Sequence, residues 1–368
     1  MPMTETEMVT RRNFLAAAAG LLVLPKPGFS IAPGLQLVSP VSRDGEHFAA
    51  GLPTARNAPH LVRLPMRGHG LSLDPRHPDE ALIIGRRPGT IAVKVSMTKG
   101  TLIQQWSAAE DRHFLGHAVF SRDGDTIFMT ENNADSGRGI VSVRDATSFR
   151  VLAEYDTHGI GPHELMMMPD GVTLAVANGG IRTLPETGRV KLNRGRIETS
   201  LVYLDSRTGQ LRGKYVVPST QQSLRHLAVT PDGRVAAALQ FEGDKKTPDV
   251  PLMMFHHGES TLKFATAPDT VWNRMRHYAA SVAYDPLSDC FALTCPLGDT
   301  MGIWSSAGEY LGSIAVPKVS GVAFHDGRGF ASNELGEVYQ IDLLRLTATR
   351  LAHFPGMQWD NHLYLARV

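Results

Sequence analysis

A short recurring pattern restricts the fold more than any other feature of the chain: two apolar runs joined by an Asp-Gly or similar tight turn. It is clearest in VFSRDGDTIFMTEN (119–132), MMPDGVTLAVANGG (167–180) and AVTPDGRVAAALQF (228–241). Weaker copies are SLDPRHPDEALIIG (72–85), VAYDPLSDCFALTC (282–295) and VAFHDGRGFASNEL (322–335). Because the glycine of the turn can take a positive φ, each of the three clear copies predicts an antiparallel pair of strands, and the weaker copies are interpreted as similar units.

These strand pairs belong to longer units. A third apolar run follows each pair, namely IAVKVS, GIVSVRD, SLVYLDS, PLMMFHH, MGIWSS and EVYQID. Several units continue through a turn into a fourth run, as in YLDSRTGQLRGKYVV (203–217). Four strands repeated roughly every 40–60 residues are typical of the blades of a β-propeller.

Six complete units are visible, and the two ends of the chain supply a seventh. The C-terminal WDNHLYLARV (359–368) offers a first strand, VSRDGEHFAAGLP (41–53) the turn and the second strand, and HLVRLP (60–65) a third. A shared blade protects the sheet edges and fastens the circle. We therefore expect an all-β fold, a single seven-bladed β-propeller over residues 32–368 closed by strands from both termini, with six or eight blades as alternatives.

One position of the repeat carries an unexpected residue type. When the units are aligned on their turns, the residue before each innermost strand is His69, His117, His163, His226, Ser281, Ser320 or His362. In a propeller this position lies at one mouth of the central channel, so we expect the five imidazoles to converge on the axis. His69 and His163 stand one residue further from their turns, and a slip of one would reverse a side chain in a strand unless a small bulge absorbs it. The remaining His113, His256, His257 and His353 do not share this phase, and we expect them to be solvated or incidental.

The same mouth should receive the polar loops that follow the second strands. They carry Glu131, Asn178, Gln240 and Glu334, while Glu164 and Arg225 lie next to histidines in the sequence. Neutral imidazoles with nearby carboxylates suit iron, copper or zinc, and polar neighbours such as these can orient the ligands. We predict a transition-metal site, iron favoured and copper possible, in which glutamates could move protons and Arg225 could bind an anion. The alternative is a water-filled channel that simply tolerates the imidazoles.

Bulk properties exclude several other classes. With 37 Lys and Arg against 36 Asp and Glu, the chain has no basic excess to replace the counterions of a nucleic acid. Cys290 and Cys295 fall in one predicted strand on opposite faces, so they should be reduced core residues without a mutual disulfide. No segment after the N-terminus approaches the roughly 20 apolar residues of a membrane helix.

The N-terminal TRRNFLAAAAGLLVL (10–24) places Arg11 and Arg12 before a short alanine- and leucine-rich stretch. This arrangement is similar to a twin-arginine export signal. We assign residues 1–31 to the signal and a linker. The protein is then expected in the periplasm, exported in its folded state.

From residue 35 onward the chain resembles an uncharacterised family of twin-arginine-exported periplasmic propellers, a domain of unknown function. The residues that carry the resemblance are RGHGLSLDP, FLGHAVFS, GPHELMMMPDG, LRHLAVTPDG and DNHLYLA. The resemblance implies a role in periplasmic iron handling, with imelysin-type iron-uptake lipoproteins as partners. The architecture is also similar to the propeller of nitrous oxide reductase, but Ser281 and Ser320 depart from its histidine ring, and no cupredoxin domain follows.

The expected function is a metal-binding propeller that serves iron or copper acquisition or redox handling, and whether it is an enzyme stays open. Two alternatives come from other classes: a hydrolase or dehydrogenase of the lactonase or quinoprotein type, and a non-catalytic protein-interaction scaffold. Turnover that is insensitive to chelators would favour the first, and a partner retained without the histidines would favour the second.

Overall fold

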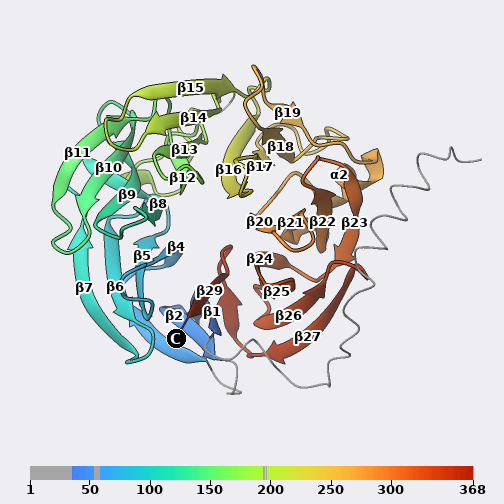
Figure 1. Cartoon of the computed structure of the whole chain (residues 1–368), viewed down its shortest axis with the longest axis horizontal. Coiled ribbons are helices and arrows are strands. Elements are labelled where there is room, and N and C mark those ends of the chain that lie inside the picture. The colour runs from blue at the N-terminus through green and yellow to red at the C-terminus, as the bar shows by residue number, and fades with distance from the viewer. Residues whose placement is uncertain (1–34, 54–58, 194, 196, 368) are drawn as a thin grey trace, which may run out of the picture.

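Seven antiparallel sheets stand around a central axis as the blades of a propeller (Figure 1). The computed structural model describes residues 35–53, 59–193, 195 and 197–367. The predicted all-β fold and its seven blades are confirmed. The export signal predicted for residues 1–31 lies outside the described residues. Within those residues, no helix is long and apolar enough to cross a membrane.

Six blades are built from four strands that follow one another in the chain, beginning next to the axis and ending at the rim. Blade 1 consists of β4 (Gly68–Leu73), β5 (Glu80–Gly85), β6 (Ile91–Ser96) and β7 (Thr101–Ser107). Blade 2 consists of β8 (Arg112–Phe120), β9 (Thr126–Asn133), β10 (Gly139–Asp145) and β11 (Val151–Asp156). Blade 3 consists of β12 (Pro162–Met167), β13 (Thr173–Asn178), β14 (Ser200–Asp205) and β15 (Leu211–Val216).

The next three blades repeat this order. Blade 4 consists of β16 (Gln222–Val229), β17 (Val235–Phe241), β18 (Met253–His256) and β19 (Lys263–Phe264). Blade 5 consists of β20 (Ser281–Asp285), β21 (Cys290–Cys295), β22 (Thr300–Ser305) and β23 (Tyr310–Ala315). Blade 6 consists of β24 (Val319–His325), β25 (Arg328–Asn333), β26 (Glu337–Asp342) and β27 (Thr347–His353). All six predicted third strands are confirmed, and they are β6, β10, β14, β18, β22 and β26.

The closing blade joins both ends of the chain. Its strands are β28 (Met357–Trp359), β29 (Tyr364–Arg367), β1 (Leu35–Arg43), β2 (Glu46–Pro53) and β3 (His60–Leu64). Both β28 and β29 pair with β1, followed by β2 and β3. Closure by both termini is therefore confirmed, but the expected strand positions were wrong by one. β1 is the second strand of this blade, and the prediction did not include it. The turn before β2 therefore joins the second and third strands, where the first and second were expected.

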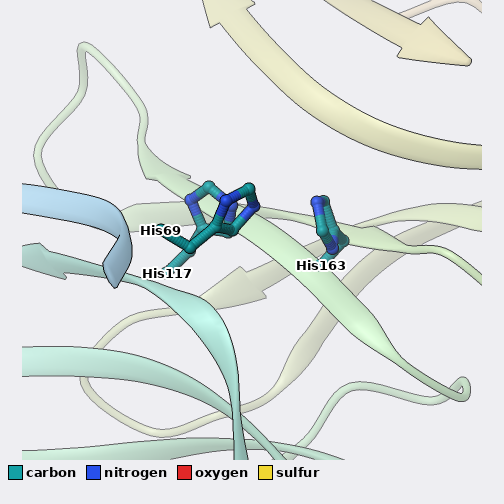
Figure 2. Close-up of side chains that lie close together, drawn as sticks. All are labelled: His69, His117 and His163. Carbon is teal, nitrogen blue, oxygen red and sulfur yellow. The ribbon is translucent and has the colours of Figure 1, made fainter. Parts of the chain in front are cut away.

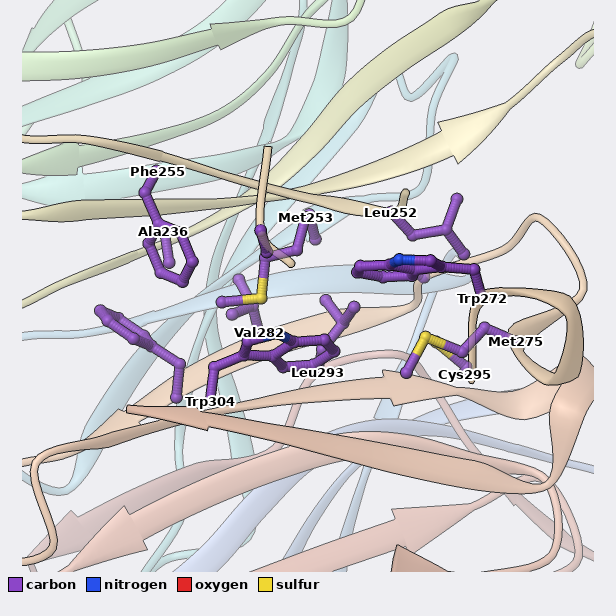
Figure 3. Close-up of a cluster of buried hydrophobic side chains, with 14 of the residues drawn as sticks. Ala236, Leu252, Met253, Phe255, Trp272, Met275, Val282, Leu293, Cys295 and Trp304 are labelled. Carbon is purple, nitrogen blue, oxygen red and sulfur yellow. The ribbon is translucent and has the colours of Figure 1, made fainter. Parts of the chain in front are cut away.

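The hydrophobic core is divided among the blade interfaces. Seven buried clusters each lie between two neighbouring sheets, since the sheets present apolar residues on both faces. Figure 3 shows the cluster between blades 4 and 5, where the ring of Trp304 stacks on that of Trp272 with the centroids 5.5 Å apart. Cys290 and Cys295 are free and buried, as expected from their positions in one strand.

Among the described residues, three short helical segments lie in the connections: η1 (Pro185–Thr187), α2 (Asp269–Met275) and η2 (Pro296–Gly298). Helix α2 follows Pro268 and ends at Arg276, whose backbone is left-handed. It buries Trp272 and Met275 against blade 5. The connection that contains η1 joins β13 to β14 and supplies Arg189 to the cavity described below.

Candidate metal centre

Five histidines from five blades lie together inside the ring. The closest pair of imidazole centroids is His226 and His362 at 4.4 Å, and the most distant of the recorded pairs is His69 and His226 at 6.0 Å. Figure 2 shows His69 and His117 with His163 beside them. All five are buried, with exposed fractions between 1% for His226 and 7% for His163.

Each histidine lies where the innermost strand of its blade leaves regular pairing. The register shifts on either side of His69, His117, His163 and His226, between residues 68 and 71, 114 and 118, 162 and 164, and 224 and 227. His362 lies in the break between β28 and β29, where its carbonyl accepts a hydrogen bond from Ser39 at 2.6 Å. A bulge changes the direction of a side chain relative to the pleat. These bulges explain how histidines at unequal distances from their turns share one direction.

Two glycines allow blades 1 and 2 to approach each other at the cluster. Gly116 has a φ of +106°, and a Cβ there would lie 2.7 Å from Cδ2 of His69. A Cβ on Gly70 would lie 2.2 Å from the carbonyl oxygen of Gly116. Only glycine fits such positions without displacing the neighbouring chain or the imidazole.

A buried carboxylate orients one of the imidazoles. Nδ1 of His69 donates to Oδ1 of Asp360 over 2.8 Å, which leaves Nε2 free to act as a ligand. The other oxygen of Asp360 accepts from Arg86 at 2.7 Å and from Arg67 at 3.1 Å. Burial opposes ionisation of this carboxyl, but Arg86, His69 and Arg67 outweigh it and hold its pKa well below the usual range.

A second carboxylate lies between two other imidazoles. The oxygens of Glu164 are 3.4 Å from Nδ1 of His117 and 3.4 Å from Nδ1 of His226. Oε2 also accepts the backbone N–H of Leu227 at 2.7 Å, which fixes the side chain. Burial raises the pKa of Glu164, and the nearby imidazoles oppose that rise.

The imidazoles are in the protonation state that binds metal. Burial lowers the pKa of all five below the ordinary 6.5, and the neighbouring histidines lower it further for four of them. They are therefore neutral near pH 7, with lone pairs available. Around His69, the hydrogen bond to Asp360 partly offsets the effect of burial on the pKa.

Among the described residues, four sets of side chains place their ligand atoms within 4.8 Å of one another; one of them, Asp74, His77 and Glu80, lies outside the cluster, and the other three lie within it and could each hold a metal ion. These three sets are His69, His117 and His163; His69, His226 and His362; and His117, Glu164 and His226. Several ring nitrogens form no hydrogen bond with any described residue: Nε2 of His117, Nδ1 of His163, both nitrogens of His226 and Nε2 of His362. A buried polar atom left unpaired costs about 1–3 kcal/mol, so a ligand that binds these nitrogens would stabilise the cluster. Imidazole with carboxylate suits iron, copper or zinc.

Other residues expected at the site have different positions. Glu131 is paired inside blade 2 with Arg144, at 2.7 Å, and with Ser142, so it does not reach the histidines. Asn178 is buried and donates to the carbonyl of Thr157 at 2.8 Å. Glu334 is exposed on the turn after β25. Glu131 lies within β9 and Asn178 is the last residue of β13, so only Glu334 lies in a loop after its second strand.

The remaining expected residues lie along the channel. Arg225 and Gln240 line a cavity beside the imidazoles of His69, His163 and His226. Ser281 and Ser320 are buried on the innermost strands of blades 5 and 6. Within the described residues, neither serine forms a hydrogen bond with an imidazole. Ser320 donates instead to the carbonyl of Lys318 at 3.1 Å.

Two histidines expected to be solvated are buried. His113 is 0% exposed, and neither ring nitrogen has a hydrogen-bond partner among the described residues. Burial, with a smaller effect of Arg87, lowers its pKa to about 4. His256 is held by the hydroxyl of Tyr203 at 2.8 Å and by a backbone carbonyl.

Three residues of the site were not anticipated from the sequence: Asp360, Arg86 and Arg87. Asp360 stands two positions before His362 in WDNHLYL, so it could have been found as a carboxylate next to a candidate ligand. Arg86 and Arg87 follow the second strand of blade 1. Polar side chains at this position are candidate site residues in the other blades, and the same signal applies to both arginines of blade 1.

The fold and the cluster define a class of protein, a seven-bladed β-propeller with a buried group of histidines that could hold a metal ion. Residues 62–366 match the family described as "Protein of unknown function (DUF1513)", and the chain belongs to that family. No curated protein sequence matches the chain significantly. Among solved structures, hydrazine synthase of Kuenenia stuttgartiensis is similar, with a TM-score of 0.58 and 15% identity, over 91% of this chain and 98% of that chain. This similarity is one of fold alone.

Proposed function

We propose that the protein is a periplasmic metal-binding propeller that holds a transition-metal ion through His69, His117, His163, His226 and His362. One observation carries the proposal: five neutral imidazoles from five blades are buried together, and four of them have ring nitrogens without hydrogen-bond partners among the described residues. Each nitrogen without a partner costs free energy that coordination of a metal ion would recover.

Two carboxylates complete the proposed centre. Asp360 holds His69 in the tautomer that exposes Nε2, as carboxylates do for histidine ligands in metal sites. Glu164 lies within reach of both His117 and His226 and can orient them, act as a ligand itself or accept a proton. A bound ion would supply Lewis-acid or one-electron chemistry, while these residues set its geometry.

The proposed metal is iron, with copper as the second possibility, and the proposed service is acquisition or redox handling of that metal. Imidazole and carboxylate ligands without a thiolate support this choice. Cys295 does not alter the ligand set, since it lies in the apolar cluster between blades 4 and 5.

The proposed location is the periplasm, after export of the folded protein. The Arg11-Arg12 pair before a short apolar stretch supports this location. An iron-uptake lipoprotein is the proposed partner, and its support is the family resemblance of the histidine-containing segments.

Metal content tests the proposal directly. Protein recovered from the periplasm of a cell that exports it should contain iron or copper in a fixed ratio to the chain. A triple variant, His117→Ala, His163→Ala and His226→Ala, should lose the metal, while His353→Ala, which changes an exposed histidine, should keep it. Added metal at about 100 times its Kd should stabilise the wild type by about 2.7 kcal/mol and leave the triple variant unchanged.

A folded wild-type protein that contains no metal and takes up no iron, copper or zinc at micromolar concentration would reject the proposal. Circular dichroism of both variants checks that a lost metal does not reflect a lost fold.

A further inference from the structure

A group of arginines faces the histidine cluster across a small cavity. Arg86 and Arg87 come from the end of β5, Arg189 from the connection between β13 and β14, and Arg225 from β16. His69, His163 and His226 also line it, so the arginines and the imidazoles face the same space.

The carboxylates nearby neutralise only part of this positive charge. Arg86 is paired with Asp360 at 2.7 Å. Arg225 is 3.5 Å from Glu242, which also pairs with Lys191. Within the described part of the chain, Arg87 and Arg189 form no hydrogen bond or ion pair. The cavity therefore has an excess of cationic groups.

Two of these guanidinium groups are buried with unused donors. Arg87 is 6% exposed and Arg225 is 2% exposed. Nη1 of Arg87 and Nε of Arg225 have no hydrogen-bond partner among the described residues. A buried charge with free donors is unfavourable unless an anion pairs with it.

The arginines also repel one another. Burial lowers the pKa of Arg87 well below its ordinary value, and the nearby Arg225 and Arg189 lower it further. Burial also lowers the pKa of Arg189. Like charges brought together at one cavity favour the binding of an anion there.

We propose that this cavity binds a small oxyanion with two or more negative charges, a polycarboxylate or a phosphate, through Arg87, Arg225 and Arg189. The planar guanidinium fork matches the paired oxygens of both groups. This anion site goes beyond the metal centre, because the arginines would hold the anion whether or not a metal is bound. A ligand seated there also lies against His163 and His226. A metal carried as an anionic chelate is therefore the substrate class we assign, and this last step alone rests on the proposed function.

Titration calorimetry of metal-free protein tests the anion site by itself. The metal should be removed with a chelating resin, since a soluble chelator is itself a polycarboxylate and would compete. Citrate and inorganic phosphate are the probes, with acetate as the singly charged comparison. We expect both probes to bind, more tightly than acetate, and more weakly as salt is added.

The variants Arg87→Gln and Arg189→Gln locate the binding. Arg87→Gln should weaken it at least about tenfold, since it removes charge-assisted hydrogen bonds. Arg189→Gln should also weaken it, and this residue lies on an exposed connection where replacement leaves the fold intact. The matched control is Arg345→Gln, because Arg345 pairs with Asp342 at the rim. Without any anion, Arg87→Gln should melt at a higher temperature than the wild type.

Two results would overturn the inference: no binding of citrate or phosphate by the metal-free wild type, or undiminished binding by both Arg87→Gln and Arg189→Gln. Failure of the metal proposal is a separate result, since the protein would then bind anions through the arginines and take up no metal.

Discussion

The carboxylate of Asp360 offers the sharpest test of how the centre is organised. It is 4% exposed and accepts hydrogen bonds from His69, Arg86 and Arg67. The variant Asp360→Asn keeps the size and most of the shape of the side chain but removes its charge. His69 then loses the partner that fixes its tautomer and strengthens Nε2 as a ligand.

Two magnitudes follow from these contacts. Loss of such a carboxylate behind a histidine ligand lowers metal affinity about 10- to 100-fold, which corresponds to about 1.4–2.7 kcal/mol. Stability should fall by about 3 kcal/mol, the lower end for a broken buried ion pair. The lower end applies because Arg67 is half-exposed and regains water, while Arg86 keeps a neutral acceptor.

Both quantities can be measured on the same samples. Competition with a chromophoric chelator gives the metal affinity, and urea denaturation of metal-free protein gives the free energy of unfolding. Asp342→Asn is the control, because it makes the same change in the exposed pair with Arg345 and should cost less than about 1 kcal/mol. A folded Asp360→Asn protein with wild-type metal affinity would refute the role assigned to the carboxylate.

Three further outcomes can be checked. Gly116→Ala should lower the free energy of unfolding by about 2 kcal/mol, since the φ of this residue is +106° and the new Cβ displaces His69. Metal affinity should therefore fall as well. An unchanged affinity would mean that this close approach of the strands is not needed. Glu337 has a pKa lowered to about 2, because its hydrogen bonds, including one with Arg350 at 2.7 Å, outweigh the effect of burial. Its stabilisation is therefore complete above about pH 5 and lost as the pH falls towards 2, and Glu337→Gln should remove about 3 kcal/mol of this acid dependence in urea titrations at several pH values. Trp304→Ala should cost about 3–5 kcal/mol in the same assay, since the side chain is fully buried between blades 4 and 5, and a loss below 1 kcal/mol would contradict that packing.

The blades were predictable because turn chemistry and strand hydrophobicity repeat. The turn at Asp170-Gly171 and its copies each fix one hairpin, and the third and fourth strands follow. The closing blade was harder, since a turn signal identifies two adjacent strands but not their distance from the axis. The turn at Asp44-Gly45 looks like that at Asp123-Gly124, yet it joins the second and third strands of its blade.

The histidines were predictable because an imidazole recurs at the same position of several repeats, directly before the apolar innermost strand. A bulge was indicated only at His69 and His163, by their distance from the turns, and not at His117 and His226, since an inserted residue changes the register without changing composition. Asp360 has no counterpart in the other blades, so comparison of repeats does not reveal it. Glu131 was assigned wrongly because its partner, Arg144, lies in the next strand of the same blade, and that pairing depends on side-chain direction.

The closing blade determines when the metal centre can be completed during folding. His362 and Asp360 lie in the segment that closes the ring and that follows the six other blades in the chain, and β1 pairs on both sides of them. During synthesis the first four histidines can therefore assemble only an incomplete pocket, and His69 has no carboxylate until this segment has been made and has paired with β1. A metal ion held by all five histidines would link blade 1 to the closing blade and would stabilise the closed propeller. Binding of the metal ion would then require that the propeller had closed.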